Sequence, residues 1–222
     1  MNHRTRIKIC GLTRLEDVNA AVDNGADAVG FVFYAKSPRY VSAQTAATLI
    51  AAVPPFVSTV GLFVNVSAAE VAAVLTQAPV SLLQFHGDES PEQCHAIAQA
   101  VNRPFIRALR VKPDMASSDL LKYAQNYRAA GNLCSGLLLD AFVDGYGGAG
   151  KVFDWSLIPK ELASQAVLSG GLNVQNAIEA VQRVRPYAVD VSSGVEREKG
   201  IKDADKIRAF VDAIRRADIS SH

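Results

Sequence analysis

The chain has 222 residues, of which 49% are hydrophobic and 20% charged, and its formal net charge at pH 7 is +1. This composition is typical of a soluble globular protein with one large or two small domains, and the balanced charge disfavours nucleic acid and anionic membranes as partners. No apolar run is long enough for a membrane span, and three widely spaced cysteines indicate a reduced cytoplasmic protein without disulfides.

The first predicted strand covers residues 7–10 and ends at Cys10, just before Gly11. In parallel α/β folds, the loops beyond the carboxyl ends of the strands carry the catalytic groups. Cys10 is therefore a candidate nucleophile or proton acceptor, although on position alone a free cysteine is more often a small buried hydrophobe. The helix that follows is expected to begin with a capping box of Thr13 and Glu16.

An arginine follows the second predicted strand, residues 28–33. Arg39 lies in the loop that comes next, where a guanidinium can bind a substrate carboxylate through two hydrogen bonds; most arginines in loops are simply solvated. The third strand, residues 57–64, leads to a helix with a capping box at Ser67 and Glu70.

The fourth strand, residues 82–86, carries two hydrogen-bonding side chains near its end. Gln84 and His86 are two positions apart, so strand alternation places both on the same face. A single histidine is more often structural, but this pair is a candidate for substrate binding. Ser90 and Gln93 form the predicted capping box of the next helix.

The sixth strand, residues 136–140, ends in an aspartate after a strongly apolar run. It follows the fifth strand, residues 105–109, and a helix expected to stop near Gly131. Desolvation of the Asp140 carboxyl would raise its pKa from about 3.9 and let it hold a proton near neutrality, as a general acid must. The alternative is a cap on the following loop, which is common for aspartate.

The segment 145–151 has the GxxxxGK spacing of a nucleotide P-loop. Val152 replaces the Ser or Thr that would bind magnesium, and the residues that follow do not resemble the long helix of that motif, so the match is rejected. A mobile loop in which Gly147 and Gly148 fold over a bound ligand, and an ordinary surface loop, explain these glycines about equally well.

The last two predicted strands, residues 166–169 and 188–192, both end in turns rich in Gly and Ser. In barrels a phosphate often binds between the loops after strands seven and eight, where backbone N–H groups and a short extra helix point at the anion. Tight turns that need glycine are the alternative, but two such turns at this place favour phosphate. The predicted phosphate-binding residues are Gly170, Gly171, Ser192, Ser193 and Gly194, with a short helix opening at Ser193.

Two further polar residues belong to this part of the chain. Asn173 is placed to cap the helix after strand seven. Asp190 puts a charge inside the last strand, where it needs a partner. For Asp190, a role in the ligand pocket and a buried salt bridge are equally open.

Eight apolar strands alternating with helices predict a parallel sheet and a (β/α)8 TIM barrel that occupies residues 1–222 as a single domain. A doubly wound open sheet is the second choice, but no strand is clearly polar enough for its edge. Around a closed barrel, strand one is three steps from strands four and six, so neither His86 nor Asp140 is a neighbour of Cys10. A Cys-His dyad is thereby disfavoured, and Cys10 and Asp140 suit proton transfer at two separate substrate atoms.

Motifs with defined residues recur from the first strand to the last. They are Lys8-Ile9-Cys10-Gly11-Leu12-Thr13, Gly30-Phe31-Val32-Phe33 with Lys36-Ser37-Pro38-Arg39-Tyr40-Val41, Val60-Gly61-Leu62-Phe63-Val64-Asn65, Gln84-Phe85-His86-Gly87, Gly147-Gly148-Ala149-Gly150-Lys151 with Phe153-Asp154-Trp155, Leu168-Ser169-Gly170-Gly171-Leu172 and Asp190-Val191-Ser192-Ser193-Gly194-Val195-Glu196. Together, and in this order, they resemble the phosphoribosylanthranilate isomerase family of tryptophan biosynthesis. Phe85, where leucine is usual, and Ala149, where threonine is common, are minor departures.

The resemblance implies an Amadori rearrangement of N-(5-phosphoribosyl)anthranilate to 1-(2-carboxyphenylamino)-1-deoxyribulose 5-phosphate, without a cofactor or metal. It implies Asp140 as the general acid that opens the ribose ring and Cys10 as the general base that takes the C2 proton. Arg39 would bind the anthranilate carboxylate, and the two loops rich in Gly and Ser would hold the phosphate.

Substrate binding is also expected of Gln84, His86 and Asp190. The expected partners are the small phosphosugar-anthranilate substrate and, if the protein is a homodimer rather than a monomer, a second copy of the chain. Two alternatives remain open: a non-catalytic phosphosugar-binding subunit, in which Cys10 only packs in the core, and another phosphosugar barrel enzyme. An indole-glycerol-phosphate synthase would want lysine and glutamate at strand tips, and a pentose-phosphate epimerase would want metal ligands; neither set is evident in the sequence.

Overall fold

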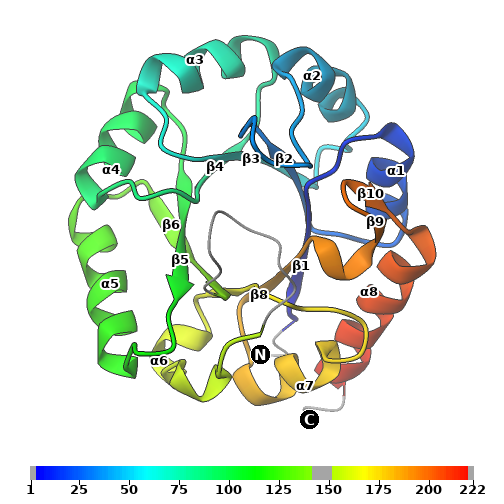
Figure 1. Cartoon of the computed structure of the whole chain (residues 1–222), viewed down its shortest axis with the longest axis vertical. Coiled ribbons are helices and arrows are strands. Elements are labelled where there is room, and N and C mark those ends of the chain that lie inside the picture. The colour runs from blue at the N-terminus through cyan, green and yellow to red at the C-terminus, as the bar shows by residue number, and fades with distance from the viewer. Residues whose placement is uncertain (1–3, 142–151, 220–222) are drawn as a thin grey trace.

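The computed structural model describes residues 4–141 and 152–219. Eight parallel strands close into a barrel in chain order, with β8 (Ala188–Val191) paired to β1 (Arg6–Cys10), and helices surround the barrel (Figure 1). The (β/α)8 fold expected from the sequence is therefore confirmed, and the open sheet is excluded.

Strands and helices alternate along the chain as predicted. The other barrel strands are β2 (Ala28–Val32), β3 (Ser58–Phe63), β4 (Leu82–Phe85), β5 (Phe105–Val111), β6 (Cys134–Ala141) and β7 (Val167–Leu168). The helices are α1 (Leu15–Asp23), α2 (Ala43–Ala51), α3 (Ala68–Gln77), α4 (Pro91–Ala100), α5 (Ser117–Ala129), α6 (Lys160–Ala163), α7 (Ala177–Val184) and α8 (Ala204–Ile219), with the 3-10 helices η1 (Trp155–Leu157) and η2 (Ser193–Val195). An antiparallel hairpin that the sequence pattern did not predict, β9 (Glu196–Glu198) and β10 (Ile201–Lys202), lies between η2 and α8.

Alternation along the strands separates two apolar layers. Outward-facing residues such as Ile9 and Phe31 belong to one large buried cluster that includes the inner faces of the helices. Inside the barrel, Ile106, Ala108 and Leu138 form a second, small cluster. The apolar filling of the barrel therefore centres on β5 and β6, and the side of β1 and β8 is available for polar residues.

Two of the three predicted capping boxes are present. Those at Ser67 in α3 and at Ser90 in α4 have both of their hydrogen bonds. The box predicted at Thr13 is wrong, because Thr13 Oγ1 donates instead to the carbonyl oxygen of Gly200 over 2.6 Å and α1 begins without a side-chain cap. That hydrogen bond ties the loop after β1 to the turn of the β9–β10 hairpin.

The last third of the barrel contains two predicted features. The side chain of Asn173 accepts hydrogen bonds from the N–H groups of Gln175 and Asn176, so it caps the turn that leads into α7, although α7 itself begins at Ala177. The short helix expected to open at Ser193 is η2. In the part of the chain that the structure describes, no helix is long and apolar enough to cross a membrane.

Candidate active site

Cys10 lies at the carboxyl end of β1, and its side chain is buried. Strand alternation puts Lys8 on the same interior face, whereas Ile7 and Ile9 pack toward the helices. Gly30 on β2 is the register partner of Cys10, and a Cβ there would come within 2.9 Å of the Cys10 sulfur. Glycine at this position therefore makes room for the thiol.

A buried ion pair lies beside Cys10. Lys8 Nζ donates to Asp190 Oδ1 of β8 over 2.7 Å, and neither side chain is more than 7% exposed. Ser169 Oγ donates to the other carboxylate oxygen over 3.2 Å. Of the two outcomes expected for Asp190, the buried salt bridge is the one observed, and its substrate contact stays a prediction.

The surroundings of Cys10 act on its ionisation in opposite directions. Burial raises the pKa of the thiol above its ordinary value, because the thiolate loses its hydration inside the barrel. The ammonium groups of Lys8 and Lys202 lower this pKa, and the carboxylate of Asp190 raises it. Burial disfavours the charged form of Lys8 as well, but Asp190 and Cys10 outweigh burial and raise the pKa of the lysine.

Asp140 lies near the carboxyl end of β6, on the interior face of the barrel, and its carboxyl is hydrogen-bonded to a histidine. Its Oδ2 lies 3.1 Å from His86 Nε2, and His86 Nδ1 lies 3.1 Å from Gln84 Nε2. An amide N–H only donates, so Nδ1 accepts and Nε2 carries the proton that is shared with Asp140. The chain from Gln84 through His86 thus fixes the direction of the acid, and His86 is not part of a dyad with Cys10.

Arg39 is buried, not solvated, and Glu196 holds one side of its guanidinium. Nε and Nη2 donate to the two carboxylate oxygens over 2.7 and 2.9 Å, and Lys202 Nζ donates to the same carboxylate over 2.9 Å. Although burial favours the neutral acid, the two cations hold the pKa of Glu196 below its ordinary value. The three side chains carry a net positive charge, and within residues 4–141 and 152–219 no hydrogen bond engages Arg39 Nη1. Gly11 brings Arg39 close to the end of β1, since a Cβ there would lie 2.5 Å from Arg39 Cδ.

The loops after β7 and β8 touch each other, as predicted from their order. A Cβ at Gly194 would overlap the carbonyl oxygen of Leu172, so this contact needs glycine. Gly170 and Gly171 have φ values of +82° and +68°, which side chains rarely allow. Ser192 Oγ donates to the carbonyl oxygen at the tip of β1 over 2.9 Å. The predicted phosphate-binding loops are therefore together, and the loop after β8 is bonded to the backbone at the tip of β1.

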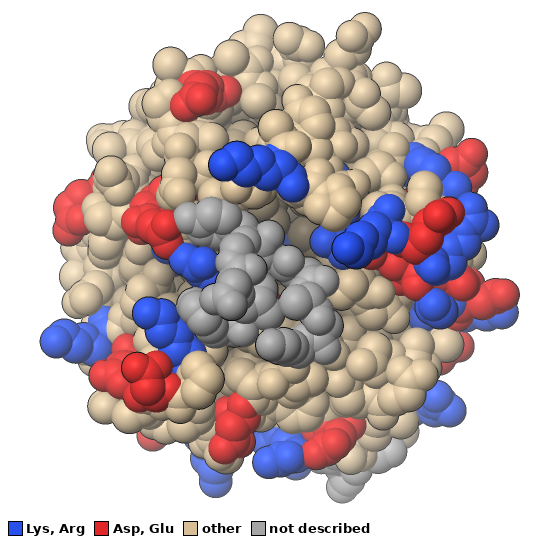
Figure 2. All heavy atoms as spheres, in the orientation of Figure 1, with Lys and Arg blue, Asp and Glu red and all other residues tan. Residues whose placement is uncertain are grey.

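Charged side chains are unevenly spread over the face viewed down the barrel. Figure 2 shows Lys and Arg side chains both near the centre of this face and at its rim, whereas most Asp and Glu side chains lie closer to the rim. A field of this kind attracts an anionic ligand toward the centre.

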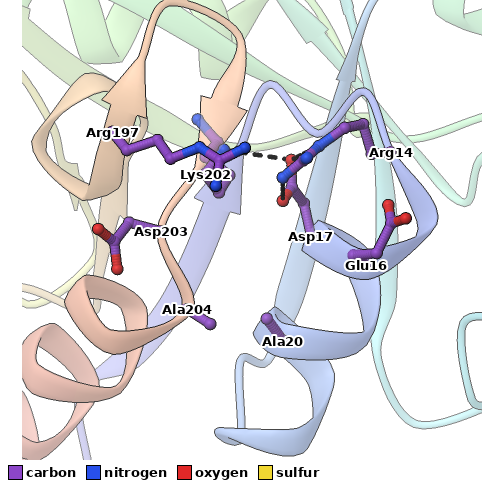
Figure 3. Close-up of a pocket in the computed structure, with 8 residues that line it drawn as sticks. All are labelled: Arg14, Glu16, Asp17, Ala20, Arg197, Lys202, Asp203 and Ala204. Carbon is purple, nitrogen blue, oxygen red and sulfur yellow. Dashed lines mark hydrogen bonds and ion pairs between the residues drawn. The ribbon is translucent and has the colours of Figure 1, made fainter.

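A pocket of about 380 Å³ opens between α1 and the β9–β10 hairpin (Figure 3). Its lining combines basic and acidic side chains that neutralise one another: Arg14 pairs with Asp17 over 2.5 Å, and Arg197 faces them from the hairpin. Lys202 contributes its backbone N–H, which donates to Asp17, while its ammonium bonds Glu196. The pocket shares Lys202 with the surroundings of Cys10, and its other lining residues come from the α1 region, the hairpin and the start of α8. The candidate active site is the barrel mouth, where Cys10 and Asp140 lie.

The model of the N-(5'phosphoribosyl)anthranilate (PRA) isomerase family matches residues 7–213. The chain belongs to this family. A protein of Herminiimonas arsenicoxydans named N-(5'-phosphoribosyl)anthranilate isomerase is 67% identical, over 98% of this chain and 96% of its own. A phosphoribosyl anthranilate isomerase solved in complex with reduced 1-(o-carboxyphenylamino)-1-deoxyribulose 5-phosphate is 41% identical with a TM-score of 0.81, and the match covers 96% of this chain and 99% of that one. Monomers generated from the dimeric enzyme of Thermotoga maritima match equally, at 40% identity, a TM-score of 0.81 and the same coverage.

Membership of the PRA isomerase family confirms the resemblance drawn from the motifs. Three charged residues of the site were nevertheless missed: Lys8, Glu196 and Lys202. For Lys8 a signal existed, since it precedes Cys10 by two positions in an alternating strand. For Glu196 and Lys202 the local sequence gave no signal, because their place in the site depends on Arg39, which is 157 residues away from Glu196. Gly147 and Gly148, expected to close over the ligand, lie outside the described residues.

Proposed function

We propose that this barrel isomerises N-(5'-phosphoribosyl)anthranilate to 1-(o-carboxyphenylamino)-1-deoxyribulose 5-phosphate by an Amadori rearrangement, in the biosynthesis of tryptophan. The observation that carries the proposal is the separation of two proton-transfer groups. Cys10 ends β1 beside the contacting loops of β7 and β8, and Asp140 ends β6 with its carboxyl held by His86. A phosphosugar anchored at those loops would meet an acid and a base at different atoms.

In the proposed mechanism, Asp140 donates a proton to the ribose ring oxygen, and the bond between that oxygen and C1 breaks. The cationic iminium that results makes the C2 hydrogen acidic, and the Cys10 thiolate accepts it. The neutral enolamine then tautomerises to the ketone, with a proton gained at C1 and one lost from the C2 hydroxyl. No net proton is consumed, and acid and base catalysis are each worth about 100-fold to 10,000-fold in rate.

Substrate binding is proposed to follow the charges of the site. The Nη1 end of Arg39 binds the anthranilate carboxylate, while Glu196 holds the Nε side of the same guanidinium. The two loops rich in Gly and Ser bind the phosphate through backbone N–H groups. Of the remaining predicted substrate contacts, His86 faces Asp140, whereas Gln84 is fully buried against His86 and the Asp190 carboxylate accepts from Lys8 and Ser169. The last two therefore support substrate binding mainly through His86 and Lys8.

Several broader features belong to the same proposal. Residues 1–222 form one catalytic domain that works in the cytoplasm without a cofactor. The protein is a monomer or a homodimer; the dimeric relative of Thermotoga maritima supports the second state.

The proposed function is tested by the loss of fluorescence of phosphoribosylanthranilate when purified protein is added in EDTA. Cys10→Ser and Asp140→Asn are expected to keep substrate affinity within a few-fold and to lower kcat by about 100-fold or more. Cys134→Ser and the exposed Asp114→Asn serve as matched controls with normal turnover. No fluorescence loss with the unmodified protein would exclude the isomerase, and phosphate binding without turnover would favour the non-catalytic phosphosugar-binding subunit.

A further inference from the structure

Lys8 is an unusual residue for the inside of a barrel. It is 5% exposed and belongs to the same interior face of β1 as Cys10. A buried ammonium is costly unless it is paired, and a well-packed apolar side chain is often at least as stable as a buried ion pair. The neighbouring part of the same interior is filled in that way, by Ile106, Ala108 and Leu138. Stability alone therefore does not explain why this position is a lysine.

The geometry of Lys8 places its ammonium between an anion and the thiol. Asp190, its register partner on β8, accepts one N–H over 2.7 Å, and Cys10 lies two positions along on the same interior face of β1. Asp190 is in turn oriented by Ser169 Oγ on its other oxygen. Gly30 leaves space for the side chains of Cys10 and Lys8, since a Cβ at this position would lie 2.9 Å from the Cys10 sulfur and 3.2 Å from Lys8 Cε.

Three charged groups are prominent around Cys10 among the residues that the structure describes. Lys8 on its own strand, Asp190 on β8 and Lys202 on β10 act on the thiol, and β2 presents Gly30. Lys202 is committed elsewhere, because its ammonium donates to Glu196 and to two oxygens of Ser192. Lys8 is thus the cation with the strongest effect on the sulfur, and Asp190 opposes it.

We propose that Lys8 is a positioning residue of the isomerase reaction: its ammonium, anchored by Asp190, opposes the effect of burial and favours the thiolate form of Cys10 that accepts the substrate proton. The inference rests on the proposed function for its catalytic meaning, but the charge relation between Lys8 and Cys10 is measurable without turnover. Removal of the lysine charge is expected to make the thiolate harder to form. Removal of the Asp190 charge is expected to make it easier.

The decisive experiment measures the rate at which iodoacetamide alkylates Cys10 as a function of pH, with the modified peptide resolved by mass spectrometry from those of Cys94 and Cys134. Lys8→Met should slow alkylation at pH 7 about tenfold or more, since an opposite charge at this range shifts a pKa by about 1–3 units. Asp190→Asn should accelerate it, and Lys8→Arg should stay close to the unmodified protein. Lys122→Met, which removes an exposed lysine of α5, is the matched control and should change nothing.

A purely structural ion pair gives a different pattern. Lys8→Met and Asp190→Asn would then both lower Tm, while the pH profile of Cys10 alkylation would keep its midpoint in each variant. That result would overturn the proposal. A shift of the two alkylation profiles in the same direction would overturn it as well. If Lys8→Met does not fold, the rate of Cys10 alkylation in Asp190→Asn tests the proposal on its own: a faster rate supports it, and an unchanged or slower rate overturns it. The rising limb of kcat/KM against pH should move with the alkylation profile. Shifted alkylation in a protein that never consumes phosphoribosylanthranilate would refute the isomerase while the Lys8–Cys10 relation stands.

Discussion

At the scale of single residues, His86 illustrates how a side chain without its own reaction step can control one. It accepts from Gln84 at one ring nitrogen and donates to Asp140 at the other. A buried carboxyl that loses such a donor loses about 1–3 kcal/mol of interaction and also its fixed direction. The acid would then be free to turn away from the ribose ring.

We predict that His86→Asn lowers kcat about 100-fold with a smaller change in KM, because misplacement of a catalytic group by about 1 Å costs that much. Asparagine reproduces the Nδ1 position of histidine, so the contact with Asp140 is lost. Glutamine reproduces the Nε2 position, and His86→Gln should therefore recover most of the activity. His95→Asn, a change of a histidine on α4, is the control. Equal kcat values in the asparagine and glutamine variants would contradict this role.

Sequence position alone predicted that Cys10 and Asp140 lie at strand tips at one end of the barrel, and the family resemblance assigned their roles. It could not provide their partners. Strands β4 and β6 are not neighbours in the barrel, so nothing in the local pattern joins His86 to Asp140. The Arg39–Glu196 ion pair could not be predicted from local patterns for the same reason, and a solvated Arg39 was the expected alternative. Burial of a charge depends on the closed fold, which composition and alternation do not specify.

At the scale of elements, the loop after β4 is fixed by a buried arginine on the outer face of β5. Arg107 donates to the carbonyl oxygens of Phe85 and Gly87 and to the carboxylate of Glu89 over 2.8–3.0 Å. Glu89 in turn accepts from the backbone N–H groups of Gly87 and Asn65. The network holds the segment that begins with His86, so it links packing around β5 to the direction of the acid.

We expect Arg107→Met to lower the free energy of unfolding by about 3–5 kcal/mol, because it leaves the Glu89 carboxylate buried without its cation. Urea denaturation at pH 7 measures the loss. Arg128→Met is the control, since Arg128 is exposed on α5 and donates to the side chain of Gln165. A loss below about 1 kcal/mol, typical of surface ion pairs, would show that the network does not hold the loop.

The hairpin of β9 and β10 contributes the carboxylate of Glu196, and the effect of this carboxylate on the stability of the protein should depend on pH. Glu196 has a folded-state pKa below its ordinary value of 4.5, so the unfolded chain takes up the proton first on acidification. Its stabilising effect is complete above pH 4.5 and is lost as the pH falls through the folded-state pKa.

Glu196→Gln should therefore destabilise the protein most at neutral pH, by about 3 kcal/mol or more, since Arg39 and Lys202 lose their shared anion. The difference from the unmodified protein should shrink as the pH falls below 4.5. Urea denaturation at several pH values, with the exposed Glu161→Gln as control, checks both statements. A difference that stays constant down to the acid transition would refute the ionised role of Glu196.

Element boundaries show what local signals could and could not provide. The capping boxes at Ser67 and Ser90 were found because both hydrogen bonds of such a box are local. The box at Thr13 failed because a distant carbonyl, that of Gly200, took the hydroxyl. Strand β6 runs from Cys134 to Ala141, longer than its apolar core, since pairing with the long β5 continues past the hydrophobic residues.

At the scale of the whole molecule, strand order was predictable because eight similar strands with short connections have few ways to form a parallel sheet. Closure depends on β1 and β8, which pair from Arg6 and Ala188 onward. The same closure is repeated in the helical layer, where α8 contacts both α1 and α7. The described ends of the chain are joined there as well: Asp218 near the end of α8 accepts from the N–H and the hydroxyl of Thr5 over 2.9 and 2.7 Å.

Asp218→Ala should lower the free energy of unfolding by about 2 kcal/mol, because two hydrogen bonds to a charged group are lost and Thr5 is buried. The catalytic constants should not change, since Thr5 precedes β1 and Cys10 ends it, at opposite ends of the barrel. Asp212→Ala, an exposed change on the same helix, should have little effect on either quantity. Urea denaturation and steady-state kinetics on the same preparations provide the test. A fall in kcat as large as that expected for the His86 variants would mean that closure at the amino end of the barrel also controls its mouth.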